Sequence, residues 1–143
     1  DPESRPGAII PDTGLRRYDN HVRSMNVCKG PSFSGQMRRN EQTWIYLTVA
    51  NNTSERFTSM PPYPVNIAYH WKNAQGDYAV YNGQRTIFQV PLMPGESRPV
   101  KMRVDTPEEP GNYVLEISLV QEDCFWFEQH LEYLPVKLEI EVV

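Results

Sequence analysis

Apolar residues recur at every second position through most of this chain, and segments rich in Pro, Gly, Asn and Ser separate the alternating runs. A period of two is the spacing of a β-strand whose two faces meet different surroundings. The clearest runs lie at 22–27, 43–51, 64–71, 78–81, 98–104, 112–122 and 136–143. No long helical stripe accompanies them, and a short helix is expected only near 126–131. The pattern predicts an all-β fold, an antiparallel β-sandwich of about seven to nine strands.

The segments between the runs carry turn signals. Asn73–Asp77, with sequence NAQGD, joins two runs as a hairpin in which Gly76 is available for positive φ. MPGES at 93–97 and EEPGN at 108–112 each place Pro before Gly, which is typical of a type II turn. Tyr113 follows the second of these turns, at the place of the corner tyrosine of immunoglobulin-like sandwiches. We therefore expect an immunoglobulin-like arrangement in which the Tyr113 hydroxyl bonds back to the preceding loop.

Alternation also assigns the faces of two strands. In 112–122 the predicted core side carries Tyr113, Leu115, Ile117 and Leu119. In 64–71 it carries Val65, Ile67, Tyr69 and Trp71. Asn66, Ala68 and His70 then lie on the outer face, which is polar and has small features. We expect this outer face to be a platform for a ligand.

Length and composition indicate one folded domain. A chain of 143 residues is of ordinary single-domain size. Its apolar share of 39% is too high for a disordered chain, and it has no uncharged apolar stretch long enough to cross a bilayer. Residues 1–14 hold three prolines and two glycines, which predicts a linker or extended arm before a sandwich domain at 15–143. The start at Asp1, without an initiator Met, indicates a fragment of a longer protein.

Charge and cysteine content narrow the partners. The net charge is −4, and apart from the pairs Arg16-Arg17 and Arg38-Arg39 the basic residues are scattered. Nucleic acid is therefore not an expected partner, because phosphate binding needs a concentrated positive face. Cys28 and Cys124 lie far apart without a C-x-x-C spacing, which excludes a thiolate zinc site. They could pair, but a reduced state in the cytoplasm is favoured.

The sequence offers no convincing set of catalytic groups. His21, His70 and His130 share no metal-binding spacing, and no nucleophile elbow, phosphate loop or dinucleotide motif is present. The acidic pairs 108–109 and 122–123 lie at predicted strand ends, where charge usually serves solubility. We expect a protein that is not an enzyme and needs no metal or cofactor.

Two segments combine aromatic rings with polar groups: YHW at 69–71 followed by DYAVYNGQRT at 77–86, and EDCFWFEQ at 122–129. Aromatic rings accept the apolar face of a sugar, and polar side chains bind its hydroxyls or carboxylate. The candidate ligand-binding residues are Asn66, His70, Tyr81, Arg85, Trp126 and Glu128. A structural alternative stays open, in which Trp71 and Trp126 fill the core and Arg85 neutralises a buried acid.

A family resemblance adds to this interpretation. Its motifs are NNTS at 51–54, PVNIAYHW at 64–71, NGQRT at 82–86, PLMPGES at 91–97, PEEPGNYVLEISLVQE at 107–122 and WF at 126–127. They resemble a bacterial β-sandwich module that is appended to glycosyltransferases, methyltransferases and O-antigen export ATPases. YDNHVRSMNV at 18–27 resembles the first strand of one member, the C-terminal carbohydrate-binding module of Wzt-type ABC transporter ATPases.

The resemblance implies a non-catalytic module that recognises a bacterial surface polysaccharide, an O-antigen, at its terminal residues for export. Its partners would be the glycan, the ATPase domain and the membrane subunit of the transporter, with a homodimer as a further possibility. The place would be the cytoplasm, at the inner face of the bacterial inner membrane. An alternative is a structural or interaction module appended to a glycosyltransferase or methyltransferase. The family's binding residues vary with the glycan, so the resemblance supplies no ligand motif.

Overall fold

A computed structural model describes residues 25–28, 35–130 and 135–143, with the backbone alone described at 25–28 and 130. The strands are β1 (Met25–Cys28), β2 (Gln36–Met37), β3 (Gln42–Ala50), β4 (Val65–Lys72), β5 (Tyr78–Val80), β6 (Ser97–Asp105), β7 (Gly111–Gln121), β8 (Phe125–Trp126) and β9 (Val136–Val142). The short helix α2 covers Phe127–His130. Each of the seven predicted runs overlaps a strand, and the all-β prediction is confirmed.

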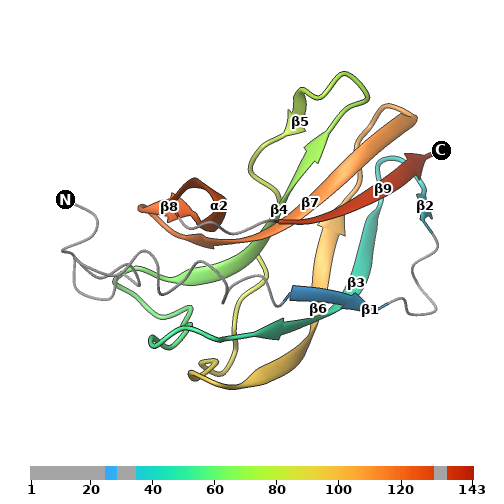
Figure 1. Ribbon diagram of the computed structural model, residues 1–143. Coiled ribbons are helices and arrows are strands. Elements are labelled where there is room, and N and C mark those ends of the chain that lie inside the picture. Colours follow the sequence, from blue (N-terminus) through green and yellow to red (C-terminus); the bar gives the residue numbers. More distant parts are fainter. Residues whose placement is uncertain (1–24, 29–34, 131–134) are drawn as a thin grey trace.

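The strands form two sheets that pack face to face (Figure 1). The smaller sheet has the order β1-β3-β6. The larger has the order β2-β9-β7-β4-β5, with β8 paired to β7. Among the described strands, all pairings are antiparallel except that of β2 with β9. The two short strands β2 and β8 were not predicted, since two residues are too few to show a period.

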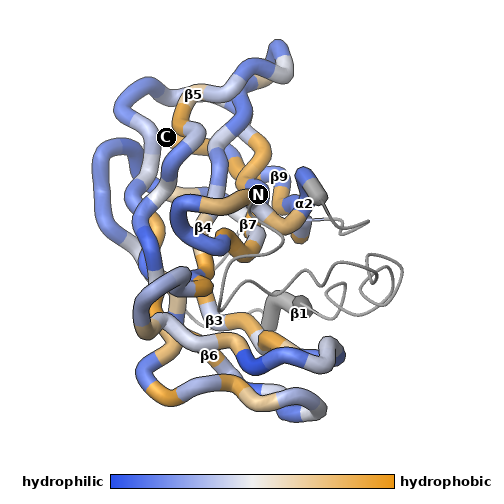
Figure 2. Tube along the Cα trace, turned by 90° about the vertical axis from the view of Figure 1, so that its left-hand side faces the viewer, coloured by the Kyte–Doolittle hydropathy of each residue, from blue (hydrophilic) through white to orange (hydrophobic). Residues whose placement is uncertain are grey.

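The core lies between the sheets and follows the alternation of the sequence. Side chains of β4 and β7 on the predicted inner side are buried in it, and β3 and β6 supply the facing layer. Trp71 is fully buried, and its indole N–H donates to the Asp105 carbonyl at 3.0 Å. Figure 2 shows hydrophobic and hydrophilic residues alternating along the strands, with hydrophilic hairpin ends. The predicted core face is confirmed.

The turn predictions have two outcomes. Gly76 and Gly95 both have a φ of 84°, as predicted for the first two turns. The third turn is wrong, because Gly111 has a φ of 153° and opens β7. The Tyr113 hydroxyl nevertheless donates to the Glu109 carbonyl at 2.8 Å, which confirms the tyrosine corner.

The loop after β3 explains the NNTS motif. The Asn51 amide is buried and donates to the carbonyls of Glu55 and Leu92 at 2.8 and 2.9 Å. Its oxygen accepts from the backbone and hydroxyl of Thr53 at 3.0 and 2.7 Å. These two residues therefore close a loop at the end of the strand.

The prediction of an open platform on the larger sheet is wrong. Asn66, Ala68 and His70 do point outward from β4, yet all three are buried. The cause is the segment after β7, where β8 and α2 turn back over the outer face of the sheet (Figure 1). Alternation identified the correct face but could not show that the chain returns to cover it.

Several predictions fall outside the described residues. These are the linker at 1–14, residues 22–24 of the first strand, the pair Arg16-Arg17, and the side chains of His21, Cys28 and His130. The extent of the domain and the pairing of the cysteines therefore stay predictions. Arg38 and Arg39 are exposed, as expected of loop charges.

Candidate functional site

The six candidate residues come together on the outer face of the larger sheet. Asn66 and His70 come from β4, Trp126 from β8 and Glu128 from α2. Tyr81 and Arg85 lie on the segment that follows β5. We call this group, with Tyr78, Ser118 and Glu122, the aromatic–polar cluster. Its members come from four separate segments of the chain, which contact one another in the fold.

His70 is the centre of the cluster and is completely buried. Its ring lies against three aromatic rings, with centroid distances of 4.0 Å to Trp126, 4.5 Å to Tyr81 and 5.2 Å to Tyr78. Nε2 is 2.8 Å from a carboxylate oxygen of Glu128, and Nδ1 contacts the Tyr81 carbonyl. Both ring nitrogens therefore face acceptors.

Glu128 ties α2 to the sheet. Its two oxygens accept from different strands, Oε2 facing His70 and Oε1 accepting from the Ser118 hydroxyl at 2.5 Å. Burial raises the pKa of this carboxyl, but the hydrogen bonds of His70 and Ser118 lower it by more, so the net pKa is below its ordinary value. The Tyr81 pKa is raised by burial and by the nearby Glu128 charge. The cluster thus holds an ionised carboxylate beside a buried imidazole.

Arg85 joins the polar and aromatic halves of the cluster. Its Nε donates to Glu122 Oε2 at 2.9 Å, and the Asn66 amide donates to the same oxygen at 2.8 Å. The guanidinium carbon lies 5.0 Å from the centre of the Trp126 ring, which is a cation–π contact. Arg85 also donates to the Gly83 carbonyl at 2.9 Å. The Asn66 oxygen is buried and has no hydrogen-bond partner among the described residues.

The segment after β5 is fixed against β4 by a close backbone approach. The Gly83 N–H donates to the Tyr69 carbonyl at 2.9 Å, and Thr86 and Ile67 exchange two backbone hydrogen bonds at 2.8 and 2.9 Å. A Cβ on Gly83 would lie 2.4 Å from the Tyr69 ring and 2.5 Å from its carbonyl oxygen. Only glycine fits there, so the NGQRT motif has a structural cause. Its Arg85 does neutralise a partly buried acid, as the structural alternative proposed.

Only the edge of this cluster is accessible to solvent among the described residues. We call this edge the rim; it is formed by Tyr78, Tyr81, Arg85, Glu122 and Gln129. Asn66 and Trp126 are 7% and 5% exposed, so their side chains face other protein atoms. Tyr78, which the sequence analysis did not select, is 48% exposed. The Gln129 amide donates to the Tyr81 hydroxyl at 3.0 Å and belongs to the same rim. Hydropathy alone does not separate Tyr78 from Tyr81, because both belong to one run.

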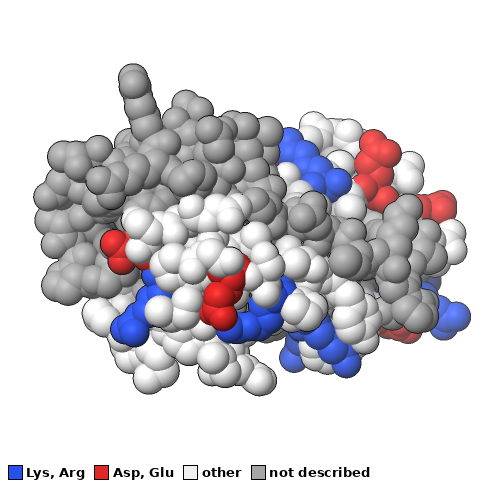
Figure 3. Space-filling view, turned by 60° about the horizontal axis from the view of Figure 1, so that its bottom comes forward, with Lys and Arg blue, Asp and Glu red and all other residues white. Residues whose placement is uncertain are grey.

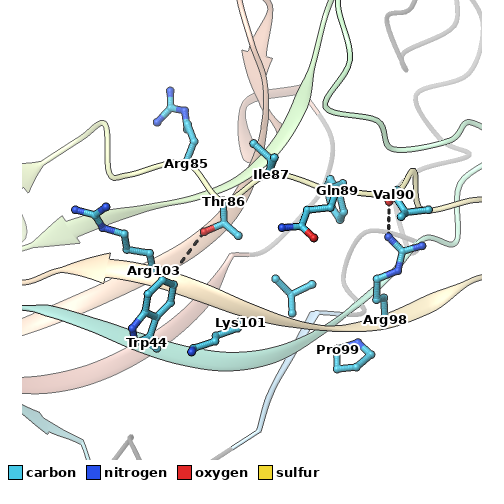
Figure 4. A pocket seen from close by; sticks show the side chains of 12 residues that line it. Trp44, Arg85, Thr86, Ile87, Gln89, Val90, Arg98, Pro99, Lys101 and Arg103 are labelled. Carbon is cyan, nitrogen blue, oxygen red and sulfur yellow. Dashed lines mark hydrogen bonds between the residues drawn. The ribbon is translucent and has the colours of Figure 1, made fainter.

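A second region was missed entirely. A groove of about 520 Å³ runs between β6 and the segment 85–90 (Figure 4). We call it the β6 groove. Trp44 of β3 is 36% exposed at one end of it, and the Lys101 ammonium of β6 lies 4.6 Å above the Trp44 ring. Trp44 falls on the polar side of a predicted strand, which is the one sequence signal that could have identified it.

The described residues form neither a metal-binding group nor a membrane-spanning helix. No group of three or more His, Cys, Asp and Glu side chains is placed to hold a metal ion. In that part of the chain, no helix has the length and apolar character needed to cross a bilayer.

Comparison with known proteins supports the fold. The sequence matches no protein-family model and no curated protein. The solved C-terminal domain of Wzt has a TM-score of 0.51 at 14% identity, over 83% of this chain and 70% of that one. A β-glucosidase from Listeria innocua in complex with glucose has a TM-score of 0.50 at 13% identity, over 82% of this chain. The match covers only 15% of that enzyme's chain. At these identities the likeness is one of fold, a β-sandwich module.

Proposed function

We propose that this chain is a non-catalytic carbohydrate-binding module for a bacterial surface polysaccharide. The polysaccharide is an O-antigen whose terminal residues are recognised for export by an ABC transporter. The observation that carries the proposal is the rim of the aromatic–polar cluster, where an exposed aromatic ring stands beside fixed polar groups. The shared fold with the C-terminal domain of Wzt supports it.

The rim matches the two sides of a sugar ring. The Tyr78 and Tyr81 rings stand perpendicular with centroids 5.0 Å apart, and the Tyr78 ring is 48% exposed. The Lys72 ammonium lies 4.9 Å from the centre of the Tyr78 ring, so an aromatic surface and a cation stand together at this point of the rim. Gln129 donates to the Tyr81 hydroxyl, and the paired Arg85 and Glu122 add donors and acceptors on the Trp126 side of the cluster. Aromatic stacking with a few oriented polar contacts is the usual composition of a small-ligand surface.

The six candidate residues then divide into two roles. Tyr81 and Arg85 reach the rim and would contact the glycan. Asn66, His70, Trp126 and Glu128 lie beneath it and would hold those two side chains in place, because buried groups cannot reach a ligand without moving. The proposed site is therefore a supported surface whose binding atoms are few.

The proposed function also implies a binding affinity and a set of partner proteins. A surface of this kind binds weakly by itself, on the order of micromolar to millimolar. Dimerisation of an attached ATPase domain would raise the effective affinity by bringing two modules to one polymer. The partners are then the glycan, the ATPase and the transporter's membrane subunit, at the cytoplasmic face of the inner membrane.

The test is a titration of this chain with the terminal oligosaccharide of its own host's O-antigen, followed by NMR. Tyr78→Ala should weaken binding about tenfold or more while leaving the fold intact, because the ring is half exposed. Met60→Ala serves as the control, since Met60 is 66% exposed on a loop and lines neither the cluster nor the β6 groove. Indifference to the oligosaccharide, or equal loss in both variants, would remove the proposal.

A second candidate is a structural or interaction module within a longer enzyme of polysaccharide synthesis. It is favoured by the β-glucosidase match, in which a sandwich of this fold occupies a small part of a long chain. This candidate expects the cluster rim to be covered by a neighbouring domain. Hydrogen exchange at Tyr78 and Arg85 in the full-length protein distinguishes the two, and a hydrolysis screen on polysaccharide tests whether the chain itself is catalytic.

A further inference from the structure

We propose that the β6 groove is a second carbohydrate site, selective for a sugar that carries a negative charge, a carboxylate or a phosphate. The proposal rests on the proposed function in one respect, since it takes the ligand to be a saccharide. The groove shares Arg85 with the aromatic–polar cluster, and its other lining residues do not belong to that cluster.

The groove is positively charged. Among the described residues that line it, none is acidic and four are basic: Arg85, Arg98, Lys101 and Arg103. Arg85 points away from the groove toward Glu122 (Figure 4). Figure 3 turns the lower side of Figure 1 toward the viewer, where Lys and Arg side chains lie at several places, with Asp and Glu side chains beside some of them. A ligand with an anionic group is therefore the complementary occupant.

Lys101 is the cation with the most free charge. Arg98 lies 3.9 Å from Glu96, and Arg103 lies 3.3 Å from Asp105. Among the described residues no acidic side chain pairs with the Lys101 ammonium, whose contact is with the face of the Trp44 ring. An incoming carboxylate would meet the Lys101 ammonium without first displacing a protein carboxylate.

The two walls of the groove suit a sugar ring. One wall is formed by β6, with Lys101 and Arg103, and by Trp44 beside it. The opposite wall presents the exposed apolar side chains of Ile87 and Val90 and the amide of Gln89 (Figure 4). A pyranose has an apolar face and polar edges, so it can meet both walls. The volume of about 520 Å³ lies within the roughly 300–1,000 Å³ of small-molecule sites.

The edge of β6 argues against an acidic peptide as the occupant. β6 ends the smaller sheet, so its outer backbone groups could in principle pair with an added strand. The Arg103 N–H already donates to the Thr86 hydroxyl at 3.3 Å. By alternation the next outward positions are Lys101 and Pro99, and proline has no N–H. The Asp105 N–H donates to the Tyr69 hydroxyl at 2.8 Å, so between Pro99 and Asp105 the Lys101 N–H is the outward donor left, which is too little for strand addition along the groove.

The experiment compares a charged probe with its uncharged form. Tetragalacturonic acid and its methyl ester share one sugar backbone and differ in charge, and mannose 6-phosphate tests phosphate in place of carboxylate. We expect one acidic probe to shift the NMR signals of the Trp44 indole and the Lys101 and Arg103 amides saturably, and at least tenfold more tightly than the ester. Lys101→Glu should abolish this binding, Lys101→Arg should keep it within about threefold, and Arg38→Glu, an exposed change outside the groove, should leave it unchanged.

Other outcomes overturn the inference. Equal binding of acid and ester excludes charge selection, and equal binding of a hexaglutamate peptide excludes a saccharide site. Absence of saturable shifts with both acidic probes excludes the groove as a site. If glycans shift Tyr78 and Tyr81 but not Trp44, the proposed function stands and this inference fails.

Discussion

The aromatic–polar cluster and the β6 groove both combine aromatic and charged residues, but these residues are largely buried in the cluster and exposed in the groove. In the cluster, aromatic and charged side chains contact one another, and His70 and Trp126 are buried. In the groove, Trp44 and Lys101 contact each other at the surface, and both remain accessible. Sequence composition therefore does not separate a supporting region from a binding region. The difference depends on which segment of the chain returns over the strand.

The difference in burial implies a difference in how much each region contributes to the free energy of unfolding. Groups that are buried in mutual contact contribute to folding, and their removal leaves cavities or unpaired partners. Groups at an open surface contribute less to folding. Variants in the two regions should thus differ in what they lose, and the following changes test this from the largest effect to the smallest.

The largest effect on stability is expected from Gly83→Ala. The added methyl would lie 2.4–2.5 Å from the ring and carbonyl of Tyr69, so the segment that carries Arg85 must move off β4. We expect a loss of about 3 kcal/mol in the free energy of unfolding, measured by urea denaturation. Asn82→Ala is the control, since its exposed side chain accepts one long bond of 3.4 Å from Arg85. A Gly83 variant as stable as this control would show that the motif is not structural.

His70→Ala comes next. It removes a fully buried ring from between Trp126 and Tyr81 and leaves the Glu128 carboxylate without that partner. The cavity and the unpaired acceptor together predict a loss of about 2–3 kcal/mol. Thermal unfolding monitored by tryptophan fluorescence would report it. Stability close to that of the unmodified chain would mean that the cluster is not a packing unit.

Gly83 and His70 show which features of the fold and of the cluster could be predicted from the sequence. Strand period gave the faces of β4 and β7, and residue chemistry selected six side chains that do meet in space. It could not give their burial, because α2 and β8 cover them through contacts between residues more than 50 positions apart, such as His70 with Glu128. It missed Trp44 because one aromatic residue on the polar side of a strand is common.

Glu128 predicts a smaller effect that depends on pH. Its pKa in the folded chain is below the ordinary value of 4.5, so its ionised form stabilises the fold. That stabilisation is fully present above about pH 4.5 and is lost as the pH falls through the lower folded value. In Glu128→Gln, denaturation at a series of pH values should show a shallower loss of stability below pH 4.5. Ser118→Ala removes one of the bonds that lower the pKa, so its curve should fall between the other two. Identical acid limbs in all three proteins would contradict this role.

Trp44→Ala should have the smallest effect on stability and the clearest effect on binding. The ring is 36% exposed and covers β6 with one face, so its loss should cost about 1 kcal/mol or less. The same change removes the aromatic wall beside Lys101, and the acidic saccharide should then bind at least tenfold more weakly in calorimetric titration. His70→Ala predicts the reverse order, with a large loss of stability and little change in the groove. If Trp44→Ala instead unfolds the chain while His70→Ala leaves it stable, the assignment of support to the cluster and of binding to the groove is inverted.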